Sequence, residues 1–174
     1  MEELKKHIRH VPDFPKKGIT FYDVTTLFQS PEGFSLALDQ MESYVRSIGA
    51  RKILAIESRG FIVGAALADR LNLPMVLARK PGKLPYKTIS EEYSLEYGTD
   101  RIEIHRDAIG TGDRVVVVDD LVATGGTLKA ACKLVERSGG EVAGISAIIA
   151  LTFLPFAEIL AGYDLNYLVS YDSE

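Results

Sequence analysis

Two adjacent acidic residues at the end of an apolar run form the sharpest chemical feature of the sequence. Four consecutive valines, 115–118, precede Asp119 and Asp120, and a loop of small residues, 121–127, leads into a helical pattern. A run of valines predicts a central strand that is covered on both faces. The first N–H groups of a helix have no partner within it and carry positive charge. The segment therefore predicts a strand, an anion-binding loop and a helix.

The predicted loop and the acids before it suit different parts of one ligand. Gly125 and Gly126 let backbone amides approach a phosphate closely, and Thr124 and Thr127 offer hydroxyl donors. Carboxylates repel a phosphate, but they accept hydrogen bonds from a ribose diol or bind a divalent cation. A sugar phosphate contains both kinds of group, so it is the ligand that the segment favours.

Other phosphate-binding motifs fit the sequence poorly. A nucleoside triphosphatase would need G-x-x-x-x-G-K-[ST], but the Gly82-Lys83 pair is followed by Leu84. A dinucleotide-binding fold would need G-x-G-x-x-G after a strand, whereas Gly110 and Gly112 precede one. An ordinary capped turn would explain one threonine and one glycine in the loop, but not two adjacent acids after a buried strand.

The elements that must position this segment alternate between strands and helices. Apolar residues at three- and four-residue steps predict a helix over 33–48, and short apolar runs predict strands. The expected strands are 53–56, 74–78, 101–105, 115–118, 144–151 and 165–169, and the further helices are 61–71, 128–139 and a short one between the last two strands. This alternation predicts an α/β fold with a mainly parallel central sheet flanked by helices, whose ligands bind at the carboxyl ends of the strands.

Two stretches lie outside this alternation. Residues 1–32, which contain several prolines, are expected to form an irregular N-terminal arm. Residues 80–100 separate two strands by more than the ~12 to 15 residues usual for structureless connections. Their length favours a mobile lid, and the alternative is a protruding hairpin used for packing or for a dimer contact.

Composition narrows the class of protein. The chain has 174 residues, enough for one domain, and 20 basic against 24 acidic residues give a net charge of −4, which disfavours a nucleic-acid-binding protein. The single cysteine, Cys132, fits a core residue in a reducing compartment, and the three histidines lack metal-ligand spacing. Neither a signal peptide nor a membrane span is expected, so we expect a cytoplasmic protein.

Residues 115–127 resemble the phosphoribosyl pyrophosphate (PRPP) motif of type I phosphoribosyltransferases. Further segments resemble the adenine-using members of that family over nearly the whole chain, namely 12–15, 18–23, 57–61, 79–85 and 93–98. The resemblance implies the type I phosphoribosyltransferase fold as a single domain over 1–174. It also implies a base-binding hood within residues 1–32, a flexible catalytic loop over 80–100, and a homodimer.

The resemblance further implies a reaction of purine salvage, in which adenine displaces pyrophosphate from PRPP, with Mg²⁺, to form AMP. The 5-phosphate is expected on Ala123, Thr124, Gly125, Gly126 and Thr127, and the ribose hydroxyls on Asp119 and Asp120. Pyrophosphate is expected to contact Glu57, Ser58, Arg59, Arg79, Lys80 and Lys83, with the Glu57–Ser58 peptide in the cis form. Mg²⁺ is expected to be held mainly by PRPP rather than by a dedicated protein ligand, with Asp119 and Asp120 as candidates for a contact.

Two residues are expected to take part in catalysis. By the resemblance, Arg59 stabilises the leaving group, and Glu96 is the acid/base near the imidazole edge of the purine. Tyr86 and Tyr97 are expected to cover the site, because water would hydrolyse the activated sugar.

Base recognition is expected from the hood residues Ile19, Thr20, Phe21 and Tyr22, with Phe21 stacked on the purine. Tyr22 stands where other members of the family have arginine, so base choice depends on whether the contact there is made by the main chain or the side chain. One rival hypothesis is an enzyme for hypoxanthine, xanthine or orotate, against which segments 18–23 and 95–98 argue. Another is a ligand-sensing regulator without catalysis, which would need a nucleic-acid-binding surface.

Overall fold

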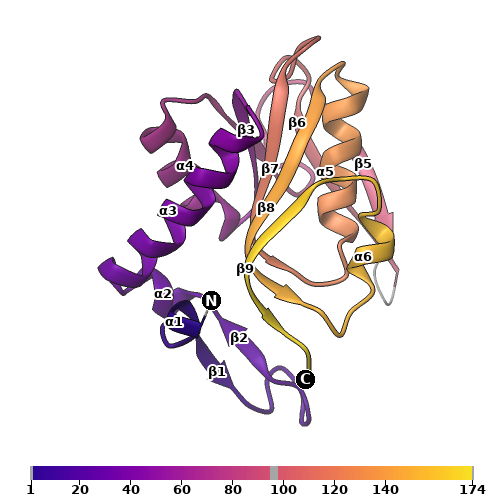
Figure 1. The fold of residues 1–174 in the computed structure, drawn as a ribbon. Coiled ribbons are helices and arrows are strands. Elements are labelled where there is room, and N and C mark those ends of the chain that lie inside the picture. Colours follow the sequence, from indigo (N-terminus) through magenta and orange to yellow (C-terminus); the bar gives the residue numbers. More distant parts are fainter. Residues whose placement is uncertain (1, 95–97, 174) are drawn as a thin grey trace.

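The computed structural model describes residues 2–94 and 98–173 and has the predicted alternation of strands and helices (Figure 1). The helices are α1 (Glu2–Lys5), α2 (Thr25–Phe28), α3 (Pro31–Ser47), α4 (Gly60–Leu71), α5 (Gly126–Arg137) and α6 (Phe156–Ile159). The strands are β1 (Arg9–Val11), β2 (Phe21–Asp23), β3 (Lys52–Ile56), β4 (Met75–Ala78), β5 (Thr88–Ser94), β6 (Thr99–His105), β7 (Arg114–Val122), β8 (Glu141–Leu151) and β9 (Leu165–Tyr171). None of the helices in the described ranges is long and apolar enough to cross a membrane.

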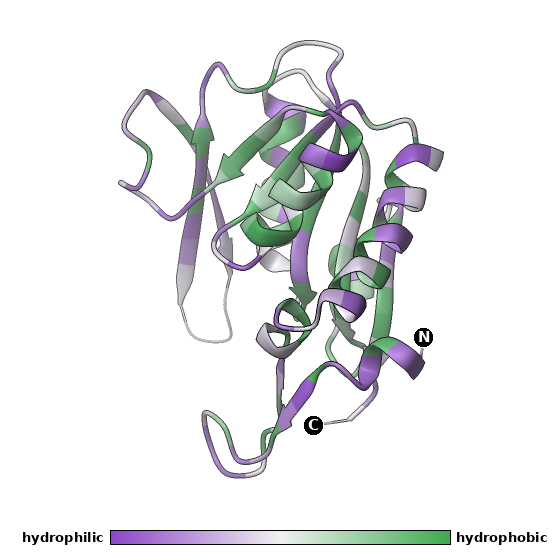
Figure 2. Ribbon diagram, turned by 90° about the vertical axis from the view of Figure 1, so that its left-hand side faces the viewer, coloured by the Kyte–Doolittle hydropathy of each residue, from purple (hydrophilic) through white to green (hydrophobic). Residues whose placement is uncertain are grey.

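The central sheet is parallel throughout, with the strand order β4-β3-β7-β8-β9. The valine run explains why β7 lies inside it. Val116 and Val118 pack in the apolar layer formed with α3 and α4, whereas Val115 and Val117 pack in the layer formed with α5. A strand that faces apolar layers on both sides must be apolar at every position, and Figure 2 shows largely hydrophobic central strands. The predicted α/β fold is thus confirmed.

The strand order reverses between β3 and β7, since β4 lies on one side of β3 and β7 on the other. Open parallel sheets bind ligands at the carboxyl ends of the strands beside such a reversal. β3 ends at Ile56, so its pairing with β7 stops at Val118, whereas β7 continues beside β8 to Val122. The prediction that this strand ends at Val118 was therefore wrong, because pairing with β8 keeps Asp119 and Asp120 in the strand.

Residues 80–100 contain more regular structure than a structureless lid would. β5 and β6 form an antiparallel hairpin that stands beside the sheet and packs on α5 (Figures 1 and 2). Glu91 of β5 pairs with Lys133 at 3.2 Å and with Arg137 at 2.6 Å, both on α5. Tyr93 and Ile102 belong to the apolar layer of that helix. The structure thus has the hairpin alternative in this region, and its movement as a lid stays a prediction.

The N-terminal arm is also more regular than predicted, since it contains α1, α2 and the β1–β2 hairpin. Tyr22 of β2 is buried and stacks on Tyr171 of β9, with ring centroids 3.7 Å apart. Its hydroxyl donates to the Ser173 carbonyl over 2.9 Å. The prolines of the arm do not break these elements, because they fall in the β1–β2 connection and at the start of α3. Aromatic packing therefore holds the arm against the C-terminal strand.

Candidate active site

A cleft with a volume of about 320 Å³ opens at the strand reversal. It is lined by residues 56–59 at the end of β3 and after it, by Ala78 at the end of β4 and Lys80 after it, by Tyr93 and Ile102 of the hairpin, by 119–121 of β7, and by Thr127 of α5. Cleft residues among those predicted are Glu57, Ser58, Arg59, Lys80, Asp119, Asp120 and Thr127. Cations and carboxylates share one small volume, which suits a ligand that carries both phosphate and hydroxyl groups.

One ion pair joins the two strand ends. Arg59 immediately precedes α4, and its Nε donates to Oδ2 of Asp120 over 2.7 Å. The Asp120 side chain is 7% exposed, whereas that of Arg59 is 39% exposed. The guanidinium has five N–H donors, so it can hold Asp120 and still present donors to the cleft. Its Cζ also lies 5.8 Å from the ring centroid of Phe21. Arg59 thus connects the hood, α4 and β7.

A glycine allows α4 to begin this close to β7. Gly60 is the first residue of the helix, and a Cβ there would lie 2.8 Å from Oδ1 of Asp119 and 3.1 Å from the Val118 carbonyl oxygen. Any other residue would push the helix and the strand apart. Gly60 therefore sets the distance between Arg59 and the acidic pair.

The two neighbouring carboxyl groups have unequal surroundings. Burial and the adjacent charge of Asp120 raise the pKa of Asp119 well above its ordinary value. Oδ1 of Asp119 accepts a hydrogen bond from the backbone N–H of Asp120 over 2.8 Å, while the Asp120 carboxylate pairs with Arg59. This crowding of negative charge favours hydroxyl groups or a cation as ligands of the strand end, and it disfavours an anion.

A smaller cavity of about 80 Å³ adjoins the cleft where α5 begins. Its lining includes Asp119, Ala123, Thr124, Gly125 and Thr127. Gly125 is the N-cap of α5 with a φ of 87°, a conformation that glycine adopts without strain. In the described chain no side chain caps this helix end, so its first N–H groups are available to an anion. The cavity has the donors that a single phosphate group requires.

Glu57 organises the cations on the opposite wall. Its carboxylate accepts hydrogen bonds from Nη2 of Arg79 at 2.7 Å and from the backbone N–H of Lys80 at 3.0 Å. The hydrogen bond from Arg79 lowers the pKa of Glu57 despite its burial. Arg79 also donates to the Lys83 carbonyl over 3.1 Å, so Glu57 holds the backbone of 79–83 in place. The Glu57–Ser58 peptide is cis, which confirms that prediction.

Lys80 meets the hairpin at the edge of the cleft. Its ammonium donates to the Tyr93 hydroxyl over 2.9 Å and forms an ion pair with Asp100. The Tyr93 hydroxyl in turn donates to Oδ2 of Asp100 over 3.2 Å. The hydrogen bond from Lys80 is the main reason why the pKa of Asp100 is lowered. The three groups therefore form a closed hydrogen-bonded network.

The predicted hood residues face different ways. Phe21 approaches Arg59 and packs edge-to-face on the exposed ring of Phe14, with centroids 5.3 Å apart. The Ile19 carbonyl accepts from the Phe14 N–H over 3.1 Å, and Thr20 is half-buried. The Tyr22 side chain is taken up by its contact with Tyr171. Phe21 is therefore the hood side chain that approaches the cleft residues.

The carboxylate oxygens of the cleft suit a divalent cation that also binds phosphate groups. Within residues 2–94 and 98–173, no group of three or more His, Cys, Asp or Glu side chains is arranged to hold a metal ion. Asp119 and Asp120 are adjacent and line the cleft together. Mg²⁺ is often bound by one or two carboxylates together with substrate phosphates, and this pair meets that requirement.

Comparison with known proteins identifies the family. Residues 23–153 match the family described as "Phosphoribosyl transferase domain". The adenine phosphoribosyltransferase of Acetivibrio thermocellus is 55% identical over 170 residues, which cover 97% of this chain and 99% of that relative. The chain belongs to the adenine phosphoribosyltransferase family.

Solved structures of the adenine phosphoribosyltransferase family share the fold. The crystal structure of the Thermoanaerobacter pseudethanolicus enzyme has a TM-score of 0.94 and 49% identity, over 98% of this chain and 99% of that one. The Saccharomyces cerevisiae enzyme, complexed with D-2,5-dideoxy-2,5-imino-altritol 1,6-bisphosphate and adenine, has a TM-score of 0.90 and 35% identity over 97% of both chains. The predicted family and the predicted type I phosphoribosyltransferase fold are confirmed.

Some residues predicted from the adenine phosphoribosyltransferase resemblance lie away from the cleft. Arg79 and Lys83 do not line it, and Arg79 donates hydrogen bonds to Glu57 and to the Lys83 carbonyl. Tyr86 is 58% exposed, and its ring lies 6.2 Å from that of His105. Glu96 and Tyr97 lie outside the described residues.

Tyr93 and Asp100 are functional neighbours that the sequence reasoning missed. They lie directly opposite each other in the β5–β6 ladder, and Tyr93 lines the cleft. The only local signal for a strand here is the placement of Ile89 and Tyr93 on one face, and Glu91 between them interrupts that pattern.

Proposed function

We propose that this chain transfers the 5-phosphoribosyl group of PRPP to adenine, giving AMP and pyrophosphate, a glycosyltransferase reaction of purine salvage. The observation that carries the proposal is the arrangement of the cleft, with Asp119, Asp120 and the start of α5 on one wall and Arg59 and Lys80 on the other. Relatives named for the adenine reaction, and the yeast relative that holds adenine with a bisphosphate, support it.

The 5-phosphate binds at the start of α5. Backbone N–H groups of 123–127 and the hydroxyls of Thr124 and Thr127 donate to it, helped by the positive end of the helix. The adjoining cavity of about 80 Å³ supports a single phosphate there. Asp119 and Asp120 accept hydrogen bonds from the ribose hydroxyls, directly or through a metal.

Pyrophosphate leaves toward the opposite wall. Arg59 and Lys80 face the developing charge, Arg79 and Lys83 stand behind them, and the Glu57–Ser58 turn supplies backbone groups. Asp119 and Asp120 are the residues that would hold Mg²⁺, which would supply further positive charge for the pyrophosphate group. Positive charge fixed in advance at the leaving oxygens stabilises the transition state more than the ground state, because negative charge grows there during the reaction.

Adenine binds under the hood, with Phe21 stacked on its face and the main chain of Ile19, Thr20 and Tyr22 reading its polar edge. The Tyr22 side chain packs on Tyr171, which supports a main-chain contact and adenine specificity at that position. Glu96 takes the proton from the purine imidazole as the new bond forms. Tyr86 and Tyr97 cover the site and exclude water.

The proposal extends to the assembly and the location of the protein. Membership of the family supports a homodimer. The single cysteine, Cys132, is buried and unpaired, which supports a reducing, cytoplasmic location.

The test is AMP formation from purified protein, Mg²⁺, PRPP and adenine, with hypoxanthine, guanine, xanthine and orotate in parallel. Asp120→Ala should abolish turnover, and Glu96→Gln should reduce it by about 10² to 10⁴. Asp107→Ala, at an exposed aspartate, is the matched control and should leave turnover unchanged. Turnover with another base would overturn the adenine assignment, and tight PRPP binding without turnover would favour a ligand sensor.

A further inference from the structure

The network of Lys80, Tyr93 and Asp100 lies at the cleft, but Tyr93 and Asp100 have no part in the reaction proposed above. Lys80 follows β4, whereas its two partners lie opposite each other on β5 and β6. Tyr93 is 9% exposed and belongs to the apolar layer under α5. The network therefore joins the packed hairpin to the wall of the cleft that carries the cations.

Both ends of Lys80 are held in place. Its backbone N–H donates to Glu57 over 3.0 Å, and its ammonium donates to Tyr93 and to Asp100. An ammonium has three N–H donors, so its two partners within residues 2–94 and 98–173 leave one donor for a ligand. The side chain is 45% exposed and lines the cleft, where that donor is accessible to a ligand.

These contacts reduce the entropy that Lys80 would lose on binding a ligand. A free lysine side chain has many rotamers, and fixing it at the moment of binding weakens affinity. Burial alone would lower the pKa of Lys80, but the hydrogen bonds to Asp100 and Tyr93 raise it overall. The ammonium is therefore both charged and oriented before any anion arrives.

We propose that Asp100 and Tyr93 are positioning residues for pyrophosphate: they hold the Lys80 ammonium at the cleft wall, with one N–H donor left for the pyrophosphate group of PRPP. The inference rests on the proposed function, in which Lys80 contacts that group. Asp100 and Tyr93 act only through Lys80, so they affect ligands that carry pyrophosphate and leave AMP binding unchanged.

Asp100→Asn is the main variant, because it keeps the size of the side chain and removes its charge. The KM for PRPP and the Kd of magnesium pyrophosphate should rise about fivefold to tenfold, as for loss of a charged hydrogen bond. The kcat should fall by no more than a similar factor, because Lys80 faces charge that grows in the transition state. The Kd of AMP should stay within about twofold, because AMP has no pyrophosphate group. Tyr93→Phe keeps the ring packing, and it should raise the KM for PRPP and the Kd of magnesium pyrophosphate by a smaller factor.

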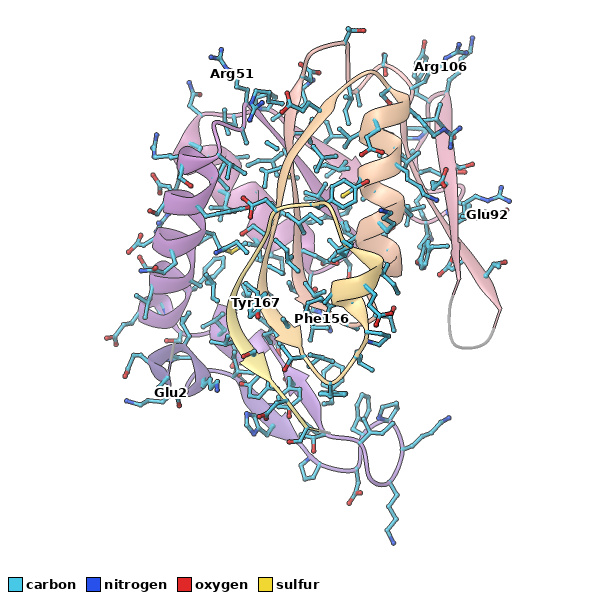
Figure 3. The ribbon with its side chains drawn as sticks, turned by 45° about the vertical axis from the view of Figure 1, so that its right-hand side comes forward. Glu2, Arg51, Glu92, Arg106, Phe156 and Tyr167 are labelled. Atoms are coloured by element: carbon cyan, nitrogen blue, oxygen red, sulfur yellow. The ribbon has the colours of Figure 1, made fainter. Side chains whose placement is uncertain are left out.

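The matched control is Glu92→Gln on the neighbouring pair of the hairpin. Glu92 lies opposite Arg101 and pairs with it, and its side chain is 60% exposed (Figure 3). This variant also removes a charge from a hairpin ion pair, but it does not touch Lys80. Its KM for PRPP and its Kd values should equal those of the wild type.

A double-mutant cycle decides whether Asp100 acts through Lys80. In the Lys80→Met background, Asp100→Asn should no longer change the Kd of magnesium pyrophosphate. The proposal would be overturned if Asp100→Asn weakened pyrophosphate binding as much in the Lys80→Met background as in the wild type. It would also be overturned if Asp100→Asn alone weakened AMP binding, or if Asp100→Asn alone bound pyrophosphate as tightly as the wild type or more tightly. The last result would mean that Asp100 competes with the ligand for Lys80. Absence of AMP formation by the wild type would instead refute the proposed function, and the pyrophosphate titrations would be unaffected by that failure.

Discussion

β3 and β7 are neighbours in the sheet, and each continues through a loop into a helix, but they end in different ways. β3 stops at Ile56, and the residues after it include the cation Arg59 and Glu57, whose carboxylate holds Arg79. β7 continues to Val122 and carries two carboxyl groups within the strand before the loop begins. The first end therefore forms a positive wall, and the second forms a wall that accepts hydroxyl groups and then donates to a phosphate.

The carboxyl groups of the two ends show what this difference means. The pKa of Glu57 is lowered, first by its hydrogen bond from Arg79, whereas the pKa of Asp119 is raised, first by burial and then by Asp120. Glu57 is thus an anion already neutralised by Arg79, whereas Asp119 forms no ion pair within residues 2–94 and 98–173. A ligand with pyrophosphate at one end and a ribose at the other complements both walls.

The largest effect should come from removing the residue that joins the walls. Arg59→Met deletes the partner of Asp120 and a cation of the cleft. We expect kcat/KM for PRPP to fall by about 10² to 10³, as when one preorganised donor to a developing charge is lost. Steady-state AMP formation measures it. Arg106→Met, at an exposed arginine, is the matched control, and a loss of less than tenfold at Arg59 would show that the two walls work independently.

The next effect concerns the spacing between the walls. Gly60→Ala places a Cβ 2.8 Å from Oδ1 of Asp119 and 3.1 Å from a backbone carbonyl oxygen that cannot move freely. The free energy of unfolding should fall by about 1–3 kcal/mol, as in other overpacked sites. Urea denaturation followed by circular dichroism measures it.

Gly110→Ala is the control for that substitution. Its Cβ would meet only Oδ2 of Asp113, at the ordinary contact distance of 3.8 Å. The change in stability should stay within about 0.5 kcal/mol, as for most surface sites. Equal effects at the two glycines would mean that α4 can shift away from β7 without cost.

Features built from consecutive residues were predictable from the sequence. The valine run, the acidic pair and the glycines of the loop lie within 115–127, and local rules sufficed to predict a strand, a turn and a helix. The point where β7 ends was not predictable in this way. It depends on pairing with β8 at residues 119–122, which local composition does not reveal.

Pairings between distant residues were also beyond the sequence. Arg59 and Asp120 are 61 positions apart, and Lys80 and Asp100 are 20 apart, so no local spacing indicates that they meet. The charged residues of β5 favour a loop in the sequence, because the residues of α5 that neutralise Glu91 lie far from it along the chain. Glu91 is tolerated in that strand because Lys133 and Arg137 of α5 neutralise it.

The smallest effects should show the contrast between Glu57 and Asp119 as opposite pH dependences. A carboxyl group whose pKa is lowered in the folded state stabilises the fold at pH values above its pKa in the unfolded chain, which is near 4.5 for Glu57. It loses that contribution as the pH falls through its pKa in the folded state. A raised pKa has the opposite effect on stability. Ionising Asp119 destabilises the fold once the pH rises above the pKa of this group in the unfolded chain, near 3.8. Glu57→Gln should therefore destabilise the protein at pH 7, by about 1 kcal/mol, and Asp119→Asn should stabilise it.

Thermal unfolding between about pH 4 and pH 8 measures both variants against the wild type. The Tm of Glu57→Gln should approach that of the wild type from below as the pH falls, and the Tm of Asp119→Asn should approach it from above. Both substitutions preserve side-chain size and one acceptor oxygen, so each serves as the steric control for the other. Shifts of the same sign at pH 7 would mean that the two strand ends share one electrostatic environment, and the division into a positive wall and a hydroxyl-accepting wall would then be wrong.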